Sequence, residues 1–354
     1  MISISRDPRA AIACALVVSA FLAAGCGDDD VTDPAPPASD PAVFLVNSLG
    51  ETLSRYLIAS GQVAPNALAV GAQPNAMAIA AGGTTGYVVC SGANRIDVVD
   101  LDALAVLRSI DLGPGASPYA IALAGANDAY VSNWLTGEVA HVDLAGGTVQ
   151  QVIAVGPGPE GVLFVPDPGA RGADAPAGTL YVAVTRYRDD WSEVGELVAV
   201  SVPADTVMAR IAVGTNPQSV AAAPDGFLHV VCTGDYLARE GKVVIVDPVA
   251  GAVVDSVAVA GSPVAALASA GGRGFTVGFA GGLRRYDVAA RTSIESTAIR
   301  GASFLTALAY DGTDDLLYVS DFDDDQVYAV ALAADTLATT FACGDGPTHV
   351  ALRR

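Results

Sequence analysis

Residues 94–113, NRIDVVDLDALAVLRSIDLG, contain two short runs in which apolar and polar residues alternate. An aspartate-rich turn joins the two runs, and a glycine ends the second. The same phrase returns at residues 137–156 (GEVAHVDLAGGTVQQVIAVG) and 241–261 (GKVVIVDPVAGAVVDSVAVAG). Because alternation with a period of two is typical of half-buried antiparallel strands, each phrase predicts a strand pair.

Each copy of the phrase belongs to a longer unit. Each unit begins, after a glycine, with a proline-containing turn and an Ala-rich strand. A second strand, which contains the letters YV in most copies, follows and leads into the phrase. The turn positions are Pro74, Pro118, Pro159, Pro217, Pro263, Phe304 and Pro347, at spacings of 44, 41, 58, 46, 41 and 43 residues. Internal similarity at this period, with four strands per unit, predicts a β-propeller.

The two ends of the repeat region complement one another. Residues 44–47 (FLVN) match the "YV" strand but lack an Ala-rich strand before them, whereas residues 348–354 (THVALRR) are an Ala-rich strand with nothing after it. We expect the segment around Val350 to pair beside Phe44, which removes two exposed sheet edges. The sequence therefore predicts an all-β, seven-bladed propeller of four-stranded antiparallel blades over residues 42–354.

The unit resembles the repeat of the YVTN family of β-propeller proteins, which runs G-x-x-P, Ala-rich strand, Y-V-x-N, V-x-V-I-D and I-x-V-G. YVSN at 130–133, VVIVD at 243–247 and IAVG at 211–214 carry the resemblance, which covers residues 42–354. It implies the propeller fold. Similar propellers include lactone hydrolases, a lyase and dehydrogenase subunits, so the fold alone does not separate binding from catalysis.

Aspartate recurs where the third strand of a unit turns into the fourth. These positions are Asp100, Asp143, Asp247 and Asp287. An aspartate at such a position accepts hydrogen bonds from the backbone amides of the turn. We therefore interpret these four residues as structural.

Residues 1–25 read as an export signal. Arg6 and Arg9 precede the uncharged run AAIACALVVSAFLAA at 10–24, and small residues follow it. The run is 15 residues long, which is short of the roughly 20 that a membrane-spanning helix needs. We expect this segment to be removed on export.

The ending LAAGC at 22–26 resembles the lipobox of bacterial lipoproteins, which implies that Cys26 is acylated. Gly27 stands where an aspartate would be expected in lipoproteins kept at the inner membrane, so the pattern favours an outer membrane. Residues 26–41 are acidic and proline-rich and are expected to form an extended tether. The alternative is an ordinary secretory signal in which Cys26 is incidental.

The charge of the chain excludes some partners. It has 38 acidic against 18 basic residues, a net charge of −20, and such a surface repels nucleic acid and anionic headgroups. Cys90, Cys232 and Cys343, with Cys26 set aside for the lipid, do not form a disulfide framework.

One face of the propeller is expected to carry binding residues. In a four-stranded meander, the loop that enters the first strand and the loop between the second and third strands lie on the same face. The long loops at 186–196 and 235–242 belong to this upper face. Aromatic and Arg side chains, which are enriched at binding hot spots, gather there. The candidate ligand-binding residues are Tyr119, Trp134, Arg186, Arg188, Asp189, Asp190, Trp191, Tyr236 and Arg239. The alternative is that these aromatic residues only cover their own blades.

Catalytic and metal candidates are weaker. The inner strands are expected to direct Asn75, Tyr119, Glu160, Gln218, Thr348 and His349 into an axial funnel. Among these, Glu160 and His349 are an acid and a base of suitable type, although no catalytic triad order is present.

The run DFDDDQ at 321–326 offers Asp321, Asp323, Asp324 and Asp325 as ligands for Ca²⁺. It lacks the glycine and the final glutamate of an EF-hand loop, which favours a solvated acidic turn. We expect no metal and no cofactor.

Together these features predict a lipoprotein of the cell envelope, facing the periplasm or the exterior. It would act as a rigid binding module for a protein, peptide or glycan partner. A periplasmic hydrolase or lyase of lactonase type, with its site in the axial funnel, is the first alternative. A structural component of a surface layer is the second.

Overall fold

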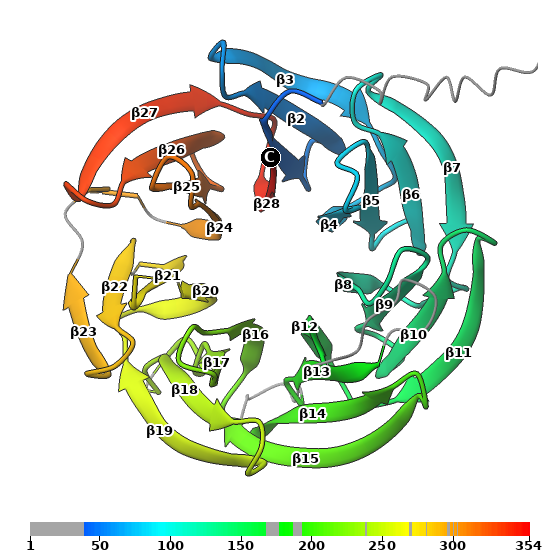
Figure 1. Ribbon diagram of the computed structural model, residues 1–354, viewed down its shortest axis with the longest axis vertical. Coiled ribbons are helices and arrows are strands. Elements are labelled where there is room, and N and C mark those ends of the chain that lie inside the picture. Colours follow the sequence, from blue (N-terminus) through cyan, green and yellow to red (C-terminus); the bar gives the residue numbers. More distant parts are fainter. Residues whose placement is uncertain are drawn as a thin grey trace, which may run out of the picture. The chain divides into compact units, whose positions relative to one another are not determined.

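The computed structural model describes residues 39–354 except 168–176, 187–192, 238, 269–270, 281, 296–297, 300 and 303. The described residues form seven four-stranded antiparallel sheets, arranged as blades around a central opening (Figure 1). This confirms the predicted all-β, seven-bladed propeller. The described residues contain no helix with the length and apolarity needed to cross a bilayer.

The first strand of each unit is the innermost strand of its blade, and the fourth strand lies at the rim (Figure 1). Blade 1 consists of β28 (Pro347–Arg353), β1 (Ala42–Asn47), β2 (Thr52–Leu57) and β3 (Gln62–Ala69). Blade 2 consists of β4 (Pro74–Ile79), β5 (Thr85–Cys90), β6 (Arg95–Asp100) and β7 (Ala105–Asp111). Blade 3 consists of β8 (Pro118–Leu123), β9 (Asp128–Asn133), β10 (Glu138–Asp143) and β11 (Thr148–Ala154).

The remaining blades follow in chain order. Blade 4 consists of β12 (Pro159–Pro166), β13 (Gly178–Val184), β14 (Gly195–Val202) and β15 (Thr206–Gly214). Blade 5 consists of β16 (Pro217–Ala222), β17 (Leu228–Cys232), β18 (Lys242–Asp247) and β19 (Ala252–Ala258). Blade 6 consists of β20 (Ser262–Ala268), β21 (Arg273–Phe279), β22 (Arg284–Asp287) and β23 (Thr292–Glu295). Blade 7 consists of β24 (Leu305–Asp311), β25 (Leu316–Asp321), β26 (Gln326–Ala331) and β27 (Thr336–Ala342).

The ring closes as predicted, because β28 pairs antiparallel with β1. Val350 lies opposite Leu45, and Ala351 lies opposite Phe44. The last described strand thus supplies the inner strand of the blade that the first described strands begin. Neither strand is left with an unpaired edge at this junction.

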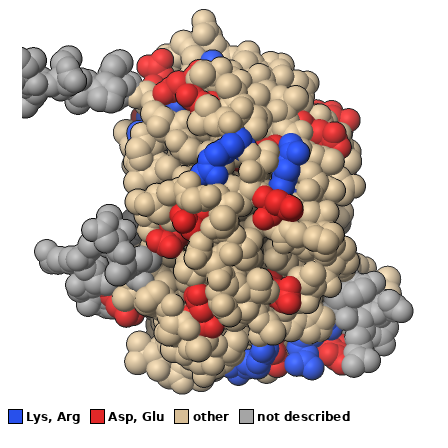
Figure 2. All heavy atoms as spheres, turned by 90° about the vertical axis from the view of Figure 1, so that its right-hand side faces the viewer, with Lys and Arg blue, Asp and Glu red and all other residues tan. Residues whose placement is uncertain are grey.

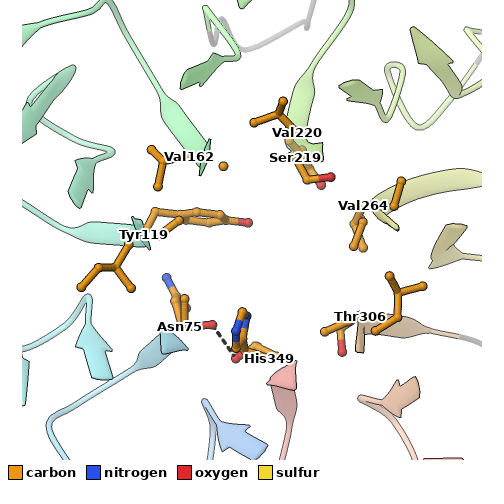
Figure 3. A pocket seen from close by; sticks show the side chains of 18 residues that line it. Asn75, Tyr119, Val162, Ser219, Val220, Val264, Thr306 and His349 are labelled. Atoms are coloured by element: carbon orange, nitrogen blue, oxygen red, sulfur yellow. Dashed lines mark hydrogen bonds between the residues drawn. The ribbon is translucent and has the colours of Figure 1, made fainter. Parts of the chain in front are cut away.

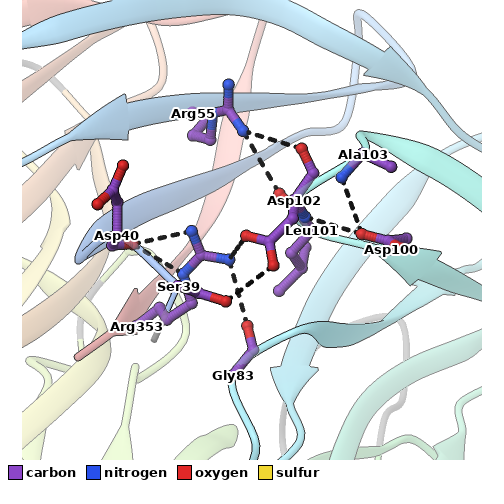
Figure 4. Close-up of polar contacts among 9 residues, drawn as sticks. All are labelled: Ser39, Asp40, Arg55, Gly83, Asp100, Leu101, Asp102, Ala103 and Arg353. Atoms are coloured by element: carbon purple, nitrogen blue, oxygen red, sulfur yellow. Dashed lines mark hydrogen bonds and ion pairs between the residues drawn. The ribbon is translucent and has the colours of Figure 1, made fainter. Parts of the chain in front are cut away.

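The last two residues fasten the closing strand to both neighbouring blades. Arg353 pairs with Asp102 of blade 2 at 2.8 Å, donates to the Asp40 carbonyl at 2.8 Å, and lies 5.3 Å from the ring centre of Phe44 (Figure 4). Arg354 donates from Nε to Asp311 of blade 7 at 3.0 Å. Each of these charge-assisted hydrogen bonds joins segments far apart in the sequence, so together they stabilise the closed ring.

The core is divided into clusters that lie between adjacent blades. One cluster, for example, packs Val89 and Ile96 of blade 2 against Val131 and Val142 of blade 3. Toward the axis the inner strands converge, and where two of them come closest there is no room for a side chain. A Cβ at Gly161 would lie 2.7 Å from the Gln218 carbonyl oxygen of the next blade.

The three described cysteines belong to this core. Cys90, Cys232 and Cys343 are buried free thiols, and burial raises the pKa of each to about 12. They therefore act as small apolar side chains.

Neighbouring blades share a recurring polar contact near the axis. A hydroxyl of one blade donates to a backbone carbonyl at the start of the next inner strand, and we call this the junction hydrogen bond. It runs from Thr233 to Pro263 at 2.6 Å and, at the same repeat position, from Ser91 to Pro118. Because these carbonyls are buried between blades, each contact satisfies a group that would be costly to leave unpaired.

The aspartates at the turns between third and fourth strands have the structural role expected of them. A carboxylate oxygen of Asp100 accepts from the backbone N–H groups of residues 102 and 103 at 2.9 and 2.8 Å. Asp143 and Asp247 each accept two turn amides in the same way, and Asp287 accepts one. The four turns are thus fixed locally.

Some basic side chains near the rim pair with acidic side chains of a neighbouring blade. Arg291 pairs with Asp255 at 2.9 Å, and Arg273 pairs with Asp315 at 2.7 Å. Figure 2 shows one side of the ring, on which the few basic side chains lie beside acidic ones. Such exposed pairs add little stability individually.

Candidate functional site

A cavity of about 280 Å³, here called the axial cavity, lies where the inner strands converge. Five residues expected in an axial funnel line it, namely Asn75, Tyr119, Gln218, Thr348 and His349. Figure 3 shows the Tyr119 side chain reaching from β8 into the opening, with His349 on the neighbouring side. Most of the remaining lining is Ala and Val, as the crowding of the inner strands requires.

A second cavity of about 260 Å³, here called the mouth cavity, adjoins the first. Tyr119, Gln218, Val264, Thr306 and Thr348 line both. The additional lining residues of the mouth cavity are aromatic, namely Tyr236, Phe279, Phe304 and Phe322. A cavity of this kind, mostly apolar with a few polar atoms, is the usual form of a small-molecule site.

These four rings form a continuous surface, which we call the aromatic wall. Phe279 and Phe304 stack at 3.5 Å between ring centres, and Phe322 lies 5.3 Å from Phe304. Tyr236 meets Phe279 edge-on at 5.9 Å. Tyr236 and Phe279 are 41% and 39% exposed, so the wall has open area for a ligand although it spans blades 5, 6 and 7.

Sequence reasoning found only one member of the aromatic wall, Tyr236. The signal for the other three was present in the repeat. Phe304 takes the place of the turn proline, Phe279 takes the place of Asn133 in "YVSN", and Phe322 follows "YVSD" where Ser91 follows "YVVC". Each is a large ring where most other blades carry a small or polar residue.

Several polar groups of the mouth cavity already donate within the protein. Thr306 Oγ1 donates to the Pro347 carbonyl at 2.6 Å, and Thr348 Oγ1 donates to the Asn75 carbonyl at 3.2 Å. Gln218 Nε2 donates to the Tyr236 hydroxyl oxygen at 3.1 Å. The threonines therefore keep only lone pairs for a ligand, whereas Gln218 keeps its Oε1 acceptor and a second amide proton.

Glu160 does not line either cavity, which corrects its expected place in the funnel. Its side chain is 4% exposed and is held by the Trp134 indole, whose Nε1 donates to Oε1 at 3.3 Å. Oε2 has no hydrogen-bond partner among the described residues. Burial raises the pKa of Glu160 to about 8, and the Trp134 hydrogen bond offsets part of that rise. The carboxyl is therefore mainly neutral at pH 7.

Glu160 nevertheless belongs to the site electrostatically. It occupies the same inner-strand position as Tyr119 and Gln218, the residue after the turn proline, on the blade between theirs. Its charge is the main cause of the raised pKa of Tyr119, with burial second. Burial raises the pKa of Tyr236, and Glu160 adds to that rise. Both phenols thus lie within reach of the field of this carboxyl.

His349 lies in the axial cavity as a neutral imidazole. Burial lowers its pKa to about 4, and a hydrogen bond with the Met77 backbone offsets part of the decrease. His349 lines the axial cavity while Glu160 packs under Trp134, so the two weak catalytic candidates are not brought together in one cavity.

The other rim candidates are dispersed. Trp134 borders a separate open groove, and Arg239 borders a recess beside Lys242. Arg186 forms ion pairs with Glu193 at 3.2 Å and with Glu196 at 3.0 Å, so its guanidinium has a structural role at the base of its loop. Arg188, Asp189, Asp190 and Trp191 lie outside the described residues.

The acidic run at 321–326 has local structural roles. Asp321 is buried and accepts from the backbone N–H of residue 323 at 3.2 Å and from the Tyr328 hydroxyl at 3.1 Å. Asp325 accepts the N–H of Gly346 at 2.8 Å. Within the described ranges, no group of three or more His, Cys, Asp or Glu side chains is placed to hold a metal ion.

The architecture defines this protein as a seven-bladed β-propeller with a small, aromatic-walled cavity at one end of its axis. Solved structures with the same fold include Kuenenia stuttgartiensis hydrazine synthase, which is 15% identical at a TM-score of 0.66, over 79% of this chain and 95% of that one. A putative 6-phosphogluconolactonase from Bacteroides uniformis is 15% identical at a TM-score of 0.65, over 89% and 99%. One from Bacteroides fragilis is 13% identical at 0.64, over 91% and 100%.

At these identities the likeness shows the fold alone. No protein-family model and no curated protein matches the chain.

Proposed function

We propose that this protein is a lipid-anchored propeller of the cell envelope that binds a small ring-bearing molecule in its mouth cavity. The aromatic wall is the observation that carries the binding proposal. Its three phenylalanines occupy repeat positions at which most other blades fold with proline or with a smaller or polar residue, so the fold itself does not require them. Aromatic faces partly open to solvent give a ring-shaped ligand both apolar contact and stacking.

The envelope part of the proposal rests on the sequence of the export segment. LAAGC at 22–26 resembles a lipobox, its cysteine would carry the lipid, and the resemblance of the repeats to the YVTN family agrees with export. Cys26→Ser is expected to release the protein from the outer-membrane fraction. Cys343→Ala, which changes a buried thiol of the propeller, should leave it there. Retention of the Cys26→Ser protein in that fraction would contradict the anchor.

The binding part is tested by a thermal-shift screen of small aromatic and cyclic molecules against the full chain. A ligand present at a hundred times its Kd stabilises the folded state by about 2.7 kcal/mol, which is a measurable rise in Tm. We expect Phe304→Ala to abolish that rise, because it removes the central ring of the wall.

A matched aromatic variant distinguishes lost binding from lost stability. Phe341 stacks on Tyr56 at 4.1 Å in the contact between blades 1 and 7, away from the mouth cavity. Phe341→Ala is expected to lower the starting Tm yet retain the ligand-induced rise. An equal rise in wild type and Phe304→Ala would refute the mouth cavity as the binding site.

A hydrolase or lyase of lactonase type is the second candidate. The names of two similar structures and the neutral carboxyl of Glu160 favour it. Two features weigh against this candidate. Glu160 is outside both cavities, and no Lys or Arg is among the described lining residues to hold the phosphate of a phosphorylated substrate. Turnover of a lactone that is lost in Glu160→Gln or His349→Ala would establish this alternative in place of simple binding.

A further inference from the structure

The mouth cavity offers acceptor lone pairs but no positively charged donor among its described lining residues. Thr306 and Thr348 direct their hydroxyl protons to backbone carbonyls and keep lone pairs, and Gln218 keeps its Oε1 acceptor. An anion, such as a carboxylate or a phosphate, would find only neutral donors there, namely the second amide proton of Gln218 and the hydroxyl of Tyr119. A ligand that brings donors would pair with groups that are already oriented.

The charges around the cavity favour the same kind of ligand. No basic side chain is among its described lining residues. The buried carboxyl of Glu160, whose Oε2 has no hydrogen-bond partner among the described residues, acts electrostatically on the lining residues Tyr119 and Tyr236. The rings of the aromatic wall present negative faces that attract a cation. The net charge of −20 raises the local concentration of cations around the whole protein.

We propose that the mouth cavity binds a primary or secondary ammonium carried on a ring or a short apolar body, with Glu160 as its counter-ion. This inference rests on the proposed function and specifies the chemistry of its ligand. The ring or apolar body packs on the aromatic wall. The ammonium donates toward the lone pairs of Thr306, Thr348 and Gln218. Glu160 lies outside the cavity and acts on the ammonium through its charge, as it acts on the lining residues Tyr119 and Tyr236.

Binding of a cation is then coupled to loss of the Glu160 proton to the buffer. The titratable groups facing this carboxyl are Tyr119 from β8 and Tyr236 from the β17–β18 loop, and Trp134 is its hydrogen-bond donor. Burial, not a second charge, holds its pKa near 8, so a bound cation is the group that would lower it. If only the ionised form pairs with the ligand, affinity rises about 50-fold between pH 6 and pH 8.

The experiment compares two probes that differ mainly in charge, 2-phenylethylammonium and its uncharged analogue 2-phenylethanol. Titration calorimetry on the full chain measures both at pH 6, 7 and 8, where the amine stays protonated because alkylammonium pKa values lie near 10. We expect the ammonium to bind at least tenfold more tightly than the alcohol at pH 8, and its affinity alone to rise with pH. Two buffers of different ionisation enthalpy should reveal one proton released per ammonium bound near pH 7.

Glu160→Gln is the diagnostic variant because it keeps an acceptor for Trp134 and cannot ionise. It is expected to bind the alcohol as wild type does, and to lose the ammonium preference and its pH dependence together. Equal affinity for the two probes in wild type, or a preference that survives in Glu160→Gln, would overturn the inference. If the alcohol still binds and Phe304→Ala abolishes that binding, the proposed function stands while the ligand class fails.

If neither probe binds, the ligand class is wrong. The screen with Phe304→Ala and Phe341→Ala then decides separately whether the mouth cavity binds anything.

Discussion

Replacing Glu160 by Gln should make the free energy of unfolding depend on pH differently from wild type. In the folded protein the carboxyl has a pKa of about 8, against 4.5 for an unperturbed glutamate. Between those values the folded chain holds a proton that the unfolded chain has released. Wild-type stability therefore falls as pH rises through this window, by up to 1.36 kcal/mol per unit.

The full difference between the two pKa values corresponds to ~5 kcal/mol. The stabilisation relative to an ionised carboxyl is present below pH 4.5 and is lost by the time pH exceeds 8. Glu160→Gln has no such proton. The stability difference, variant minus wild type, is therefore expected to rise by about 3.5 kcal/mol from pH 5 to pH 8 and to level off by pH 9. Because Gln is neutral at every pH, any fixed cost of its amide in the pocket shifts the whole curve without changing its slope.

Urea unfolding of both proteins at pH 5, 6, 7, 8 and 9 measures this difference. Glu51→Gln, at an exposed glutamate in the turn before β2, is the matched control and should give a flat difference. A flat curve for Glu160→Gln as well would refute the conclusion that Glu160 is held neutral in the fold. It would also remove the basis for its coupling to a cationic ligand.

Three further outcomes follow from single contacts. His349→Asn should resist acid better than wild type. The free energy of unfolding of wild type, measured with urea, should fall by ~3 kcal/mol as pH decreases from 6.5 through the folded pKa of about 4. Arg353→Ala should lower the free energy of unfolding by about 2 kcal/mol, because the Asp40 carbonyl loses its donor and Asp102 keeps only that of the Ser39 hydroxyl. A change below about 0.5 kcal/mol would show that the ring does not depend on this residue. Gly161→Ala should cost roughly 1 to 3 kcal/mol, visible as a lower Tm, because its Cβ has no space between adjacent inner strands.

The fold was predictable because it repeats. Seven turn positions at similar spacing fix the number of blades, and the unpaired strands at Phe44 and Val350 fix how the ring closes. Consecutive strands of a blade also alternate in direction, so strand order alone decides on which face of the propeller each loop lies. None of this depends on the rotamer of any one side chain.

The site was less predictable because it depends on side-chain direction. Glu160 and Tyr119 share one repeat position, yet Tyr119 points into the axial cavity and Glu160 lies under Trp134. Arg186 carries the charge expected of a ligand contact but is paired with Glu193 and Glu196 on its own loop. The sequence pattern predicts the strand and the position from which a side chain projects, but it does not predict which residue that side chain contacts.

The aromatic wall was missed for another reason, since its members are far apart in sequence. Phe279 and Phe322 are on different blades and meet only through Phe304. They become visible when each blade is compared with the others. The other blades serve as the reference for this comparison. If most blades fold with a small residue at a given position, a large residue at that position in one blade is not needed for folding.

The junction hydrogen bonds extend this argument. In blades 2 and 5 the residue after the second strand donates the bond, as Ser91 and Thr233 do. In blades 3 and 7 that position holds Trp134 and Phe322, and a hydroxyl elsewhere makes the contact. It is Ser132 to the Glu160 carbonyl at 2.6 Å in blade 3, and Thr306, paired with Ser320, to the Pro347 carbonyl at 2.6 Å in blade 7.

Ser132 and Ser320 stand at the same place in their strands, where blades 2 and 5 have Val89 and Val231. Blades 3 and 7 therefore keep the junction hydrogen bond, although the residue after their second strand is aromatic. An aromatic residue placed only to fill space between blades would need no such relocation of a hydroxyl. The relocation leaves room for a ring at this position in both blades, Trp134 over Glu160 and Phe322 in the aromatic wall, and the second of these is the one that the binding proposal uses.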